Sequence, residues 1–339
     1  KSSRTVLPND NTLKEWIGEF MPSTINLIPL IEEKNAMIRA DRIVEEFLMD
    51  KDFEYQRVFL ARSDPALSYG SLSAVLLLKV ALNRLHLLEK RLKIPLYPIV
   101  GVGSVPFRGN FKPTNVRNCL RGYPSVQTFT LQSAFKFDYP EEVVCDAVRK
   151  LKNSKRHAPI PCVNEEAALE LVEKVSASYA SQVKSLAPLV STVSRFVPAR
   201  RRRKLHVGLF GYARSVGRRS LPRAITFCSS LYSIGLPPEL LGLNGLNRQD
   251  LKLAEELYPD FREDMRDALE FFDPDVLSFL PVRVRDAVKQ TLRILKMDFS
   301  GNPEHKKLAR FIRFCLKEDE HENLPDLITR AAKIRKFLG

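Results

Sequence analysis

The sequence has 339 residues and a formal net charge of +14, and 44% of its residues are hydrophobic while 28% are charged. This composition is typical of globular proteins and excludes disordered, collagen-like and low-complexity chains. A chain of this length forms one large domain or two of ordinary size, and it buries enough surface to fold without disulfides. No run of about 18 apolar residues occurs, so we expect no membrane span.

The cysteines are widely spaced and form no C-x-x-C pair; they are Cys119, Cys145, Cys162, Cys228 and Cys315. This pattern is typical neither of a disulfide framework nor of a zinc site, and it predicts a reduced, cytoplasmic protein. The excess of positive charge indicates a nucleic-acid partner, an anionic small substrate or simply a basic surface. The positions of the arginines along the chain decide between these interpretations.

Apolar runs bounded by polar or turn-forming residues predict five strands. They cover residues 25–31, 57–61, 97–102, 126–131 and 205–210. Apolar residues at helical spacing predict helices at residues 36–48, 72–92, 141–151, 165–196 and 222–234. Strands that alternate with helices predict a parallel sheet.

Beyond Pro237 the chain is predicted to be helical, with helices at residues 248–257, 262–271, 282–295, 304–316 and 326–337. Five strands are too few to close a (β/α)8 barrel, so either the sheet is open or about three strands precede Lys1. We expect an α/β unit that carries the active site at residues 1–242, with a helical insertion at about 141–198. A C-terminal helical region at residues 243–339 is expected to pack against it.

Acidic side chains follow the first two predicted strands. Glu32 ends the first run, and Asp64 lies three residues after the second. Because the carboxyl ends of parallel strands meet at one edge of a sheet, the two carboxylates are expected to share a Mg²⁺ or Mn²⁺ ion. The alternative interpretation is that each acid caps the helix that follows it.

Glycine-rich and arginine-rich segments follow the later strands. Residues 101–109 form a glycine-rich loop that contains Gly103, Ser104 and Arg108, and Gln132 follows the fourth strand. The segment after the fifth strand supplies Arg214, Arg218, Arg219 and Arg223. Backbone N–H groups and guanidinium groups at one edge of a sheet predict a site for phosphate or carboxylate.

The basic run at residues 200–204 precedes the fifth predicted strand, so it belongs at the opposite end of the sheet. It is either a nucleic-acid patch or a solvated basic turn. No Ser–His–Asp or Cys–His arrangement is apparent, and the residues alone supply no general acid or base.

Six sequence motifs are specific as an ordered set, although no single one is decisive. They are IPLIE at 28–32, ARSDPA at 61–66, the loop at 101–109, QTFTLQSAFKFDY at 127–139, HVGLFGYAR at 206–214 and LPRAI at 221–225. Together they resemble archaeal-type phosphoenolpyruvate carboxylase. The resemblance implies a helix-rich (β/α)8 TIM-type barrel and a homotetramer. It also implies a carbon–carbon lyase that converts phosphoenolpyruvate and bicarbonate into oxaloacetate and phosphate with Mg²⁺ or Mn²⁺, an anaplerotic reaction.

The resemblance implies a role for each matching residue. Glu32 and Asp64 resemble the metal ligands, Arg108 the contact for bicarbonate or carboxyphosphate, and Arg214 and Arg223 the arginines around the phosphate. Gly103, Ser104, Gln132 and Arg218 are expected to lie near the substrate.

The family's His-Pro motif and its first barrel strands have no counterpart here, which predicts that the sequence is the C-terminal two-thirds of a longer chain. Two alternatives remain open at this point. One is another divalent-metal barrel lyase or aldolase that acts on pyruvate-type enolates. The other is a basic nucleic-acid-binding protein that uses residues 200–204.

Overall fold

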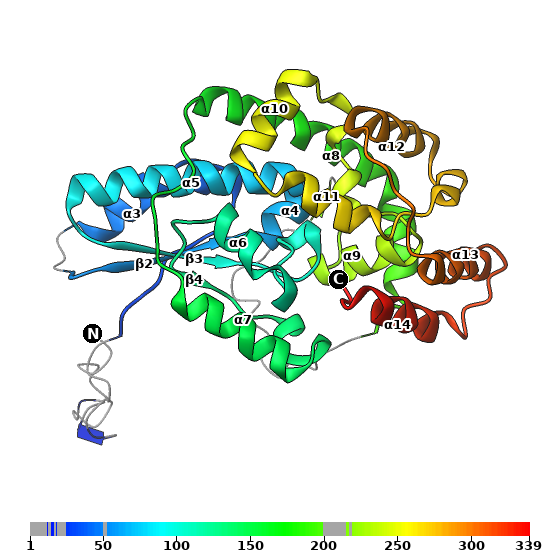
Figure 1. Cartoon of the computed structure of the whole chain (residues 1–339), viewed down its shortest axis with the longest axis horizontal. Coiled ribbons are helices and arrows are strands. Elements are labelled where there is room, and N and C mark those ends of the chain that lie inside the picture. Colours follow the sequence, from blue (N-terminus) through cyan, green and yellow to red (C-terminus); the bar gives the residue numbers. More distant parts are fainter. Residues whose placement is uncertain are drawn as a thin grey trace.

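The computed structural model describes residues 12, 15–16, 18, 25–49, 53–198, 215–216 and 219–339. Within them, four parallel strands form one sheet in the order of the sequence (Figure 1). The strands are β1 (Leu30–Ile31), β2 (Gln56–Ala61), β3 (Leu96–Gly101) and β4 (Thr128–Phe129). The first four predicted strands are therefore confirmed, and the fifth, at residues 205–210, lies outside the described residues.

The two central strands are long because each is paired along both of its edges. Val58, Leu60 and Val100 are fully buried, and β2 pairs with β3 along six residues, from Gln56 opposite Leu96 to Ala61 opposite Gly101. The outer strands β1 and β4 each pair on one side in the described part of the chain. Their ladders therefore cover two residues each, shorter than the apolar runs predicted.

Helices follow the strands in this part of the chain, up to residue 233. These are α2 (Lys34–Ile38), α3 (Ala40–Leu48), α4 (Ser63–Tyr69), α5 (Ser71–Leu92), α6 (Val116–Gly122), α7 (Glu141–Asn153), α8 (Glu165–Ser194) and α9 (Ala224–Ser233). Helices α3 and α5 lie along the β2 and β3 side of the sheet, and α7 runs beside β4 (Figure 1). Short helices α4 and α6 were not predicted, because tertiary packing rather than local periodicity stabilises them.

Helix α5 forms the centre of the core. By length and composition it is the one described helix that is apolar enough to cross a membrane, but 78% of its most apolar window is buried inside the protein. It packs against α3, α4 and α8, and its residues 72 to 82 are buried without exception. Burial in the core of the protein explains why α5 is apolar on nearly all sides.

The rest of the chain is helical, as predicted. It comprises α10 (Arg248–Leu257), α11 (Phe261–Leu269), α12 (Val282–Leu295), α13 (Pro303–Lys317) and α14 (Leu324–Arg335). Short turns of 3₁₀-helix are η2 (Pro106–Arg108), η3 (Pro113–Asn115), η5 (Pro238–Leu240), η6 (Leu243–Gly245) and η7 (Pro274–Ser278), and η4 (Ala134–Asp138) is a π-helix. A pair of antiparallel strands, β5 (Ser215–Val216) and β6 (Arg219–Ser220), was not predicted.

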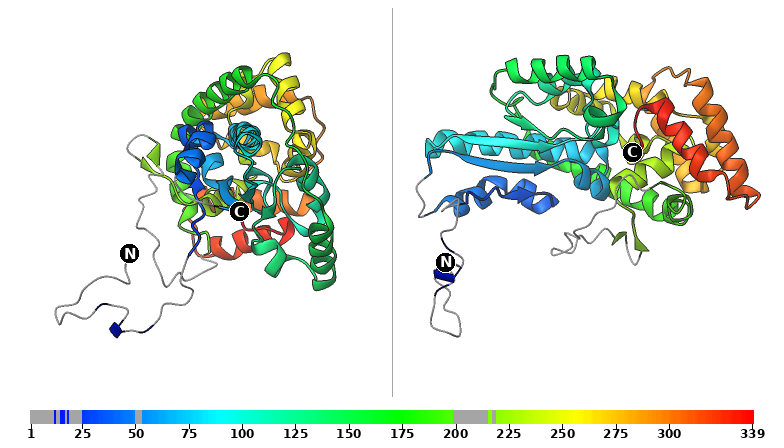
Figure 2. Two further views of the ribbon diagram at one scale, coloured as in Figure 1. Left: turned by 90° about the vertical axis from the view of Figure 1, so that its left-hand side faces the viewer. Right: turned by 90° about the horizontal axis from the view of Figure 1, so that it is seen from below.

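These later helices gather beyond the carboxyl end of the sheet, and α14 packs on α9 and α13 (Figures 1 and 2). The final residue, Gly339, consequently lies against α9, where its position is close to the backbone of Ile225. All five cysteines are free thiols.

Candidate functional site

The ends of the strands meet at one edge of the sheet. Ile31 pairs with Leu60 and Ala61 pairs with Gly101 in parallel register. Glu32, the segment 62–64 and the glycine-rich loop therefore leave the sheet side by side, as the sequence predicted for the carboxyl ends of parallel strands.

Arg108 connects these segments. Its Nε donates to Ser63 Oγ at 3.1 Å, and its Nη2 donates to Gln132 Oε1 at 2.7 Å. Its Nη1 donates to the backbone oxygen of Gly339 at 2.8 Å. The residue is 7% exposed, so one buried guanidinium joins the ends of β2 and β4 to the last residue of the sequence.

The glycine-rich loop is shaped so that the Arg108 side chain folds back over it. Gly103 donates its backbone N–H to the Arg108 carbonyl at 2.9 Å, and a Cβ at Gly103 would lie 2.9 Å from the Arg108 Cζ. Gly109 adopts a φ of +120°, which side-chain-bearing residues rarely adopt. Ser104, in the middle of the loop, is 3% exposed. The loop therefore needs glycine at both positions to hold the guanidinium in place.

A second arginine, Arg62, stabilises the glycine-rich loop through a hydrogen bond to its backbone. It is completely buried, and it donates from Nη1 to the Phe107 carbonyl at 2.9 Å and from Nη2 to Ser71 Oγ at 3.2 Å. Arg62 was not predicted to have a role, although it directly follows β2 and precedes Asp64. A charged residue immediately after a buried strand is the signal that would have identified it.

The site carries a concentrated positive charge. Burial is the main cause that lowers the pKa of the Arg108 guanidinium, while Cys228 and Asp64 raise it and Arg62 lowers it further. An arginine remains protonated at neutral pH in spite of such a shift. A buried cation whose charge is only partly balanced favours the binding of an anion.

Glu32 and Asp64 lie half-buried at this edge, on segments that follow neighbouring strands. Neither residue is the N-cap of a helix: Glu33 occupies that position for α2, and Arg62 occupies it for α4. Asp64 nevertheless lies in the first turn of α4, where an acid favours the helix N-terminus, so the capping interpretation stays open for Asp64. In the part of the chain that the structure describes, no cluster of three or more His, Cys, Asp or Glu side chains could hold a metal. Both side chains are carboxylates, the kind of oxygen donor that Mg²⁺ prefers, and a pair of them would leave the remaining positions to substrate and water oxygens.

The remaining predicted site residues are placed less fully. Arg223 is an exposed residue at the N-cap of α9, the helix on which Gly339 rests. Arg214 and Arg218 lie outside the described residues, as does the basic run at residues 200–204.

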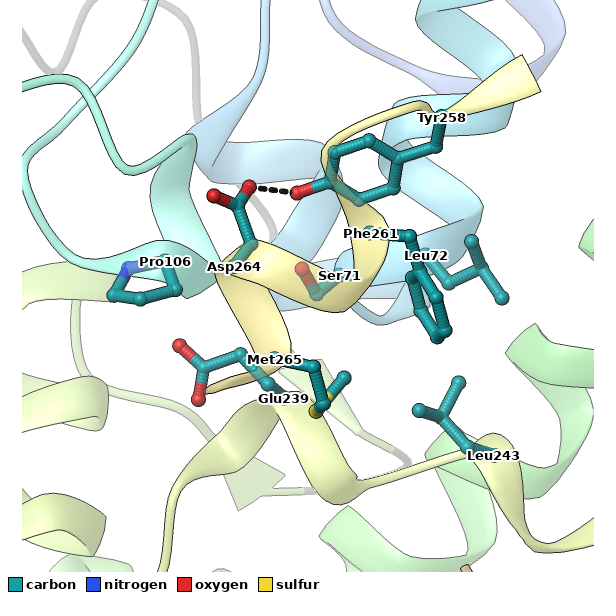
Figure 3. Close-up of a pocket in the computed structure, with 9 residues that line it drawn as sticks. All are labelled: Ser71, Leu72, Pro106, Glu239, Leu243, Tyr258, Phe261, Asp264 and Met265. Atoms are coloured by element: carbon teal, nitrogen blue, oxygen red, sulfur yellow. Dashed lines mark hydrogen bonds between the residues drawn. The ribbon is translucent and has the colours of Figure 1, made fainter. Parts of the chain in front are cut away.

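Two buried carboxyl groups that were not predicted from the sequence lie behind the glycine-rich loop. Glu239 accepts hydrogen bonds at Oε1 from the Phe107 N–H and from the Tyr232 hydroxyl. Asp264 accepts from Tyr258, as Figure 3 shows, and from Asn110 Nδ2 at 2.6 Å. Between them lies a cavity of about 10 Å³, bordered by Pro106 (Figure 3). Burial raises the pKa of each carboxyl group to about 7.

Comparison with known proteins yields a consistent match. A sequence model of the phosphoenolpyruvate carboxylase family matches residues 1–339. A phosphoenolpyruvate carboxylase of Pyrococcus abyssi is 52% identical over 333 residues, which cover 97% of this chain and 66% of the relative. Those of Methanospirillum hungatei and Methanothermobacter thermautotrophicus are 46% and 44% identical, over 97% and 99% of this chain. The chain spans 67% and 68% of the length of these last two relatives.

Proposed function

The chain belongs to the phosphoenolpyruvate carboxylase family, and from this premise we propose that it carboxylates phosphoenolpyruvate with bicarbonate to give oxaloacetate and phosphate. One observation carries the proposal. The buried guanidinium of Arg108 is held at the carboxyl edge of the sheet by Ser63, Gln132 and Gly339. Phosphoenolpyruvate, bicarbonate, oxaloacetate and phosphate are all anions, and a buried guanidinium is suited to bind an anion.

Arg108 has hydrogen-bonding capacity to spare. A guanidinium carries five N–H donors, and three hydrogen bonds to other described residues are accounted for above. The remaining N–H groups are suited to two oxygens of bicarbonate or carboxyphosphate, which a guanidinium binds in a bidentate manner. A donor fixed before the reaction stabilises the charge that develops, because it needs no reorganisation.

Glu32 and Asp64 would hold Mg²⁺ or Mn²⁺ in this proposal. When bound, the ion would act as a Lewis acid toward the phosphoryl and enolate oxygens. Asp64 is near enough for its charge to raise the pKa of Arg108, against the larger effect of burial, so the proposed ion would lie near the guanidinium. Arg214, Arg218 and Arg223 would surround the phosphate, and the loop at Gly103 and Ser104 would contact the substrate.

The larger assembly belongs to the same proposal. We expect the four parallel strands to form part of a (β/α)8 barrel at residues 1–242, with an insertion at about 141–198 and a helical region at 243–339. Sequential parallel order, which β1 to β4 follow, is the order of strands in such a barrel. A cytoplasmic homotetramer with an anaplerotic role completes the proposal.

The test is bicarbonate-dependent formation of oxaloacetate by the full protein, coupled to malate dehydrogenase. We expect Arg108→Met to lose most of the activity, and Arg117→Met, an exposed arginine on α6, to retain it. Release of phosphate that does not depend on bicarbonate would contradict the proposal and favour another barrel lyase acting on pyruvate-type enolates.

A further inference from the structure

We propose that Arg335 is a positioning residue: it fixes residues 336–339 and thereby aims the Gly339 carbonyl at the Arg108 guanidinium. Only the kinetic test of this inference depends on the proposed function. The link from Arg335 to Arg108 is structural and can be tested without any activity. Arg335 is the last residue of α14, and only three residues separate it from Gly339, whose oxygen contacts Arg108.

Arg335 is buried without a carboxylate partner among the described residues. It is 4% exposed, and the groups that act on its charge are the Tyr232 hydroxyl and the Cys228 thiol. Its Nη1 lies 2.8 Å from His305 Nε2, its Nη2 donates to the Leu338 carbonyl at 3.4 Å, and its Nε has no partner. Burial of a guanidinium group with so few hydrogen-bond partners lowers the stability of the folded protein. Packing alone would be served better by an apolar side chain of similar length.

His305 gives the guanidinium its orientation. The ring is fully buried and packs edge-on against Phe271, with ring centroids 5.1 Å apart. Burial, followed by the charge of Arg335, lowers the pKa of His305 to about 2, so the ring is neutral. Nε2 then accepts from Arg335, and the proton resides on Nδ1. A neutral, immobile acceptor fixes one arm of the guanidinium and leaves the other to reach Leu338.

The segment after Arg335 is bent so that it returns toward α9. Lys336 has a φ of +58°, which reverses the chain, and Phe337 donates its N–H to the Ala332 carbonyl at 3.2 Å. The Phe337 ring packs against Tyr232, with centroids 5.1 Å apart, and the Arg335 guanidinium lies 5.5 Å from the centre of the same ring. Arg335 therefore contacts this segment twice, through the Phe337 ring and through the Leu338 carbonyl.

The last residue is held tightly between this segment and α9. A Cβ at Gly339 would lie 2.0 Å from the Ile225 carbonyl oxygen and 2.8 Å from the Ser229 nitrogen. With Leu338 held by Arg335, the Gly339 oxygen is left in line with Arg108 Nη1. Loosening of the segment would remove one of the acceptors that fix the Arg108 guanidinium, and misplacement of a substrate-binding group by about 1 Å is enough to slow a reaction strongly.

The experiment compares Arg335→Met, Arg335→Lys and the control Arg330→Met in the full protein. Arg330 is an exposed arginine on the same helix, so its loss tests the effect of removing a charge from α14. Lysine keeps the charge but has no fork to reach His305 and Leu338 together. It is the variant to follow if the methionine variant is unstable.

Two structural readouts and one kinetic readout are measured. We expect Arg335→Met to increase hydrogen exchange at residues 336–339 and to expose Arg108 to phenylglyoxal, followed by mass spectrometry. We also expect a fall in kcat/KM of about tenfold or more, with Arg335→Lys intermediate and Arg330→Met unchanged. An activity loss without change at residues 336–339 and Arg108 would overturn the proposal, as would a loosened segment with full activity. A wild-type protein that makes no oxaloacetate would instead contradict the proposed function, and the exchange and labelling results would still decide the role of Arg335.

Discussion

The guanidinium of Arg108 and the backbone oxygen of Gly339 are joined by a hydrogen bond of 2.8 Å across 231 positions of the sequence. The bond brings the end of the described chain into the edge of the sheet where the strand ends meet. Arg108 is thereby held by the first residue of α4, by a loop after β4 and by the segment after α14. Its position depends on the correct docking of the last helices as well as on the sheet.

Substitution of Gly339 by alanine tests this dependence. The added Cβ would meet the Ile225 carbonyl oxygen at 2.0 Å, and a rigid backbone atom cannot move aside as a flexible side chain does. We expect residue 339 to be displaced and kcat/KM to fall by about tenfold or more, with little change in the melting temperature. Gly245→Ala is the matched control, because its Cβ would have only the Lys174 Cε at 3.6 Å nearby. Equal activity of the two variants would rule out a role for the Gly339 contact.

The sequence predicted the components of this site better than their connection. Arg108 was identified because it lies in a glycine-rich loop after a buried apolar run, and β3 agrees with that run to within one residue. Helices α10 and α12 have the predicted bounds because their apolar spacing is regular. Gly339 carried no local signal, since its place depends on the reversal at Lys336 and on the contact between Phe337 and Tyr232. These contacts join helices that are distant in the sequence.

Gln132 provides a second test of how Arg108 is held. Its Oε1 accepts from Arg108 Nη2 at 2.7 Å. Gln132→Met keeps the length of the side chain but removes the acceptor, so the guanidinium is expected to lose its orientation. We expect KM for bicarbonate to rise by roughly tenfold or more, because a hydrogen bond to a charged group contributes about 1.5–3 kcal/mol. The exposed Gln127→Met is the control. An unchanged KM for bicarbonate in the Gln132 variant would contradict the proposed role of Arg108.

Glu239 makes the stability of the protein dependent on pH. Burial raises its pKa to about 7, although the hydrogen bonds from Tyr232 and the Phe107 N–H act in the opposite direction, and Asp264 adds to the rise. Between pH 4.5 and 7 the folded protein keeps a proton that the unfolded chain has lost, so this carboxyl group lowers the free energy of unfolding as the pH rises. The loss is complete above about pH 7 and is at most on the order of 3 kcal/mol, at about 1.4 kcal/mol per pKa unit.

The variant Glu239→Gln isolates this contribution. Glutamine keeps an oxygen for Phe107 and Tyr232 and does not titrate. We expect the variant to gain stability relative to the wild type between pH 5 and pH 8, measured by urea unfolding at both values. The quantity to follow is the difference in unfolding free energy between variant and wild type, because two other groups titrate in both proteins. Asp264 titrates in the same pH range as Glu239. Lys79, whose pKa burial lowers to about 7, increases the free energy of unfolding as the pH rises above 7. A constant difference between variant and wild type from pH 5 to pH 8 would show that Glu239 is ionised throughout.

The two carboxylates at the strand ends can be tested without relying on activity. We expect Glu32→Gln and Asp64→Asn each to weaken Mn²⁺ binding by about tenfold or more, measured by calorimetry or by the paramagnetic resonance signal of free Mn²⁺, because an amide is a weaker ligand than a carboxylate. Glu33→Gln is the matched control, since Glu33 is the exposed neighbour of Glu32 and occupies the N-cap of α2. If the Glu33 variant loses as much affinity as the other two, the effect comes from the general negative charge at this edge and not from a metal site formed by Glu32 and Asp64.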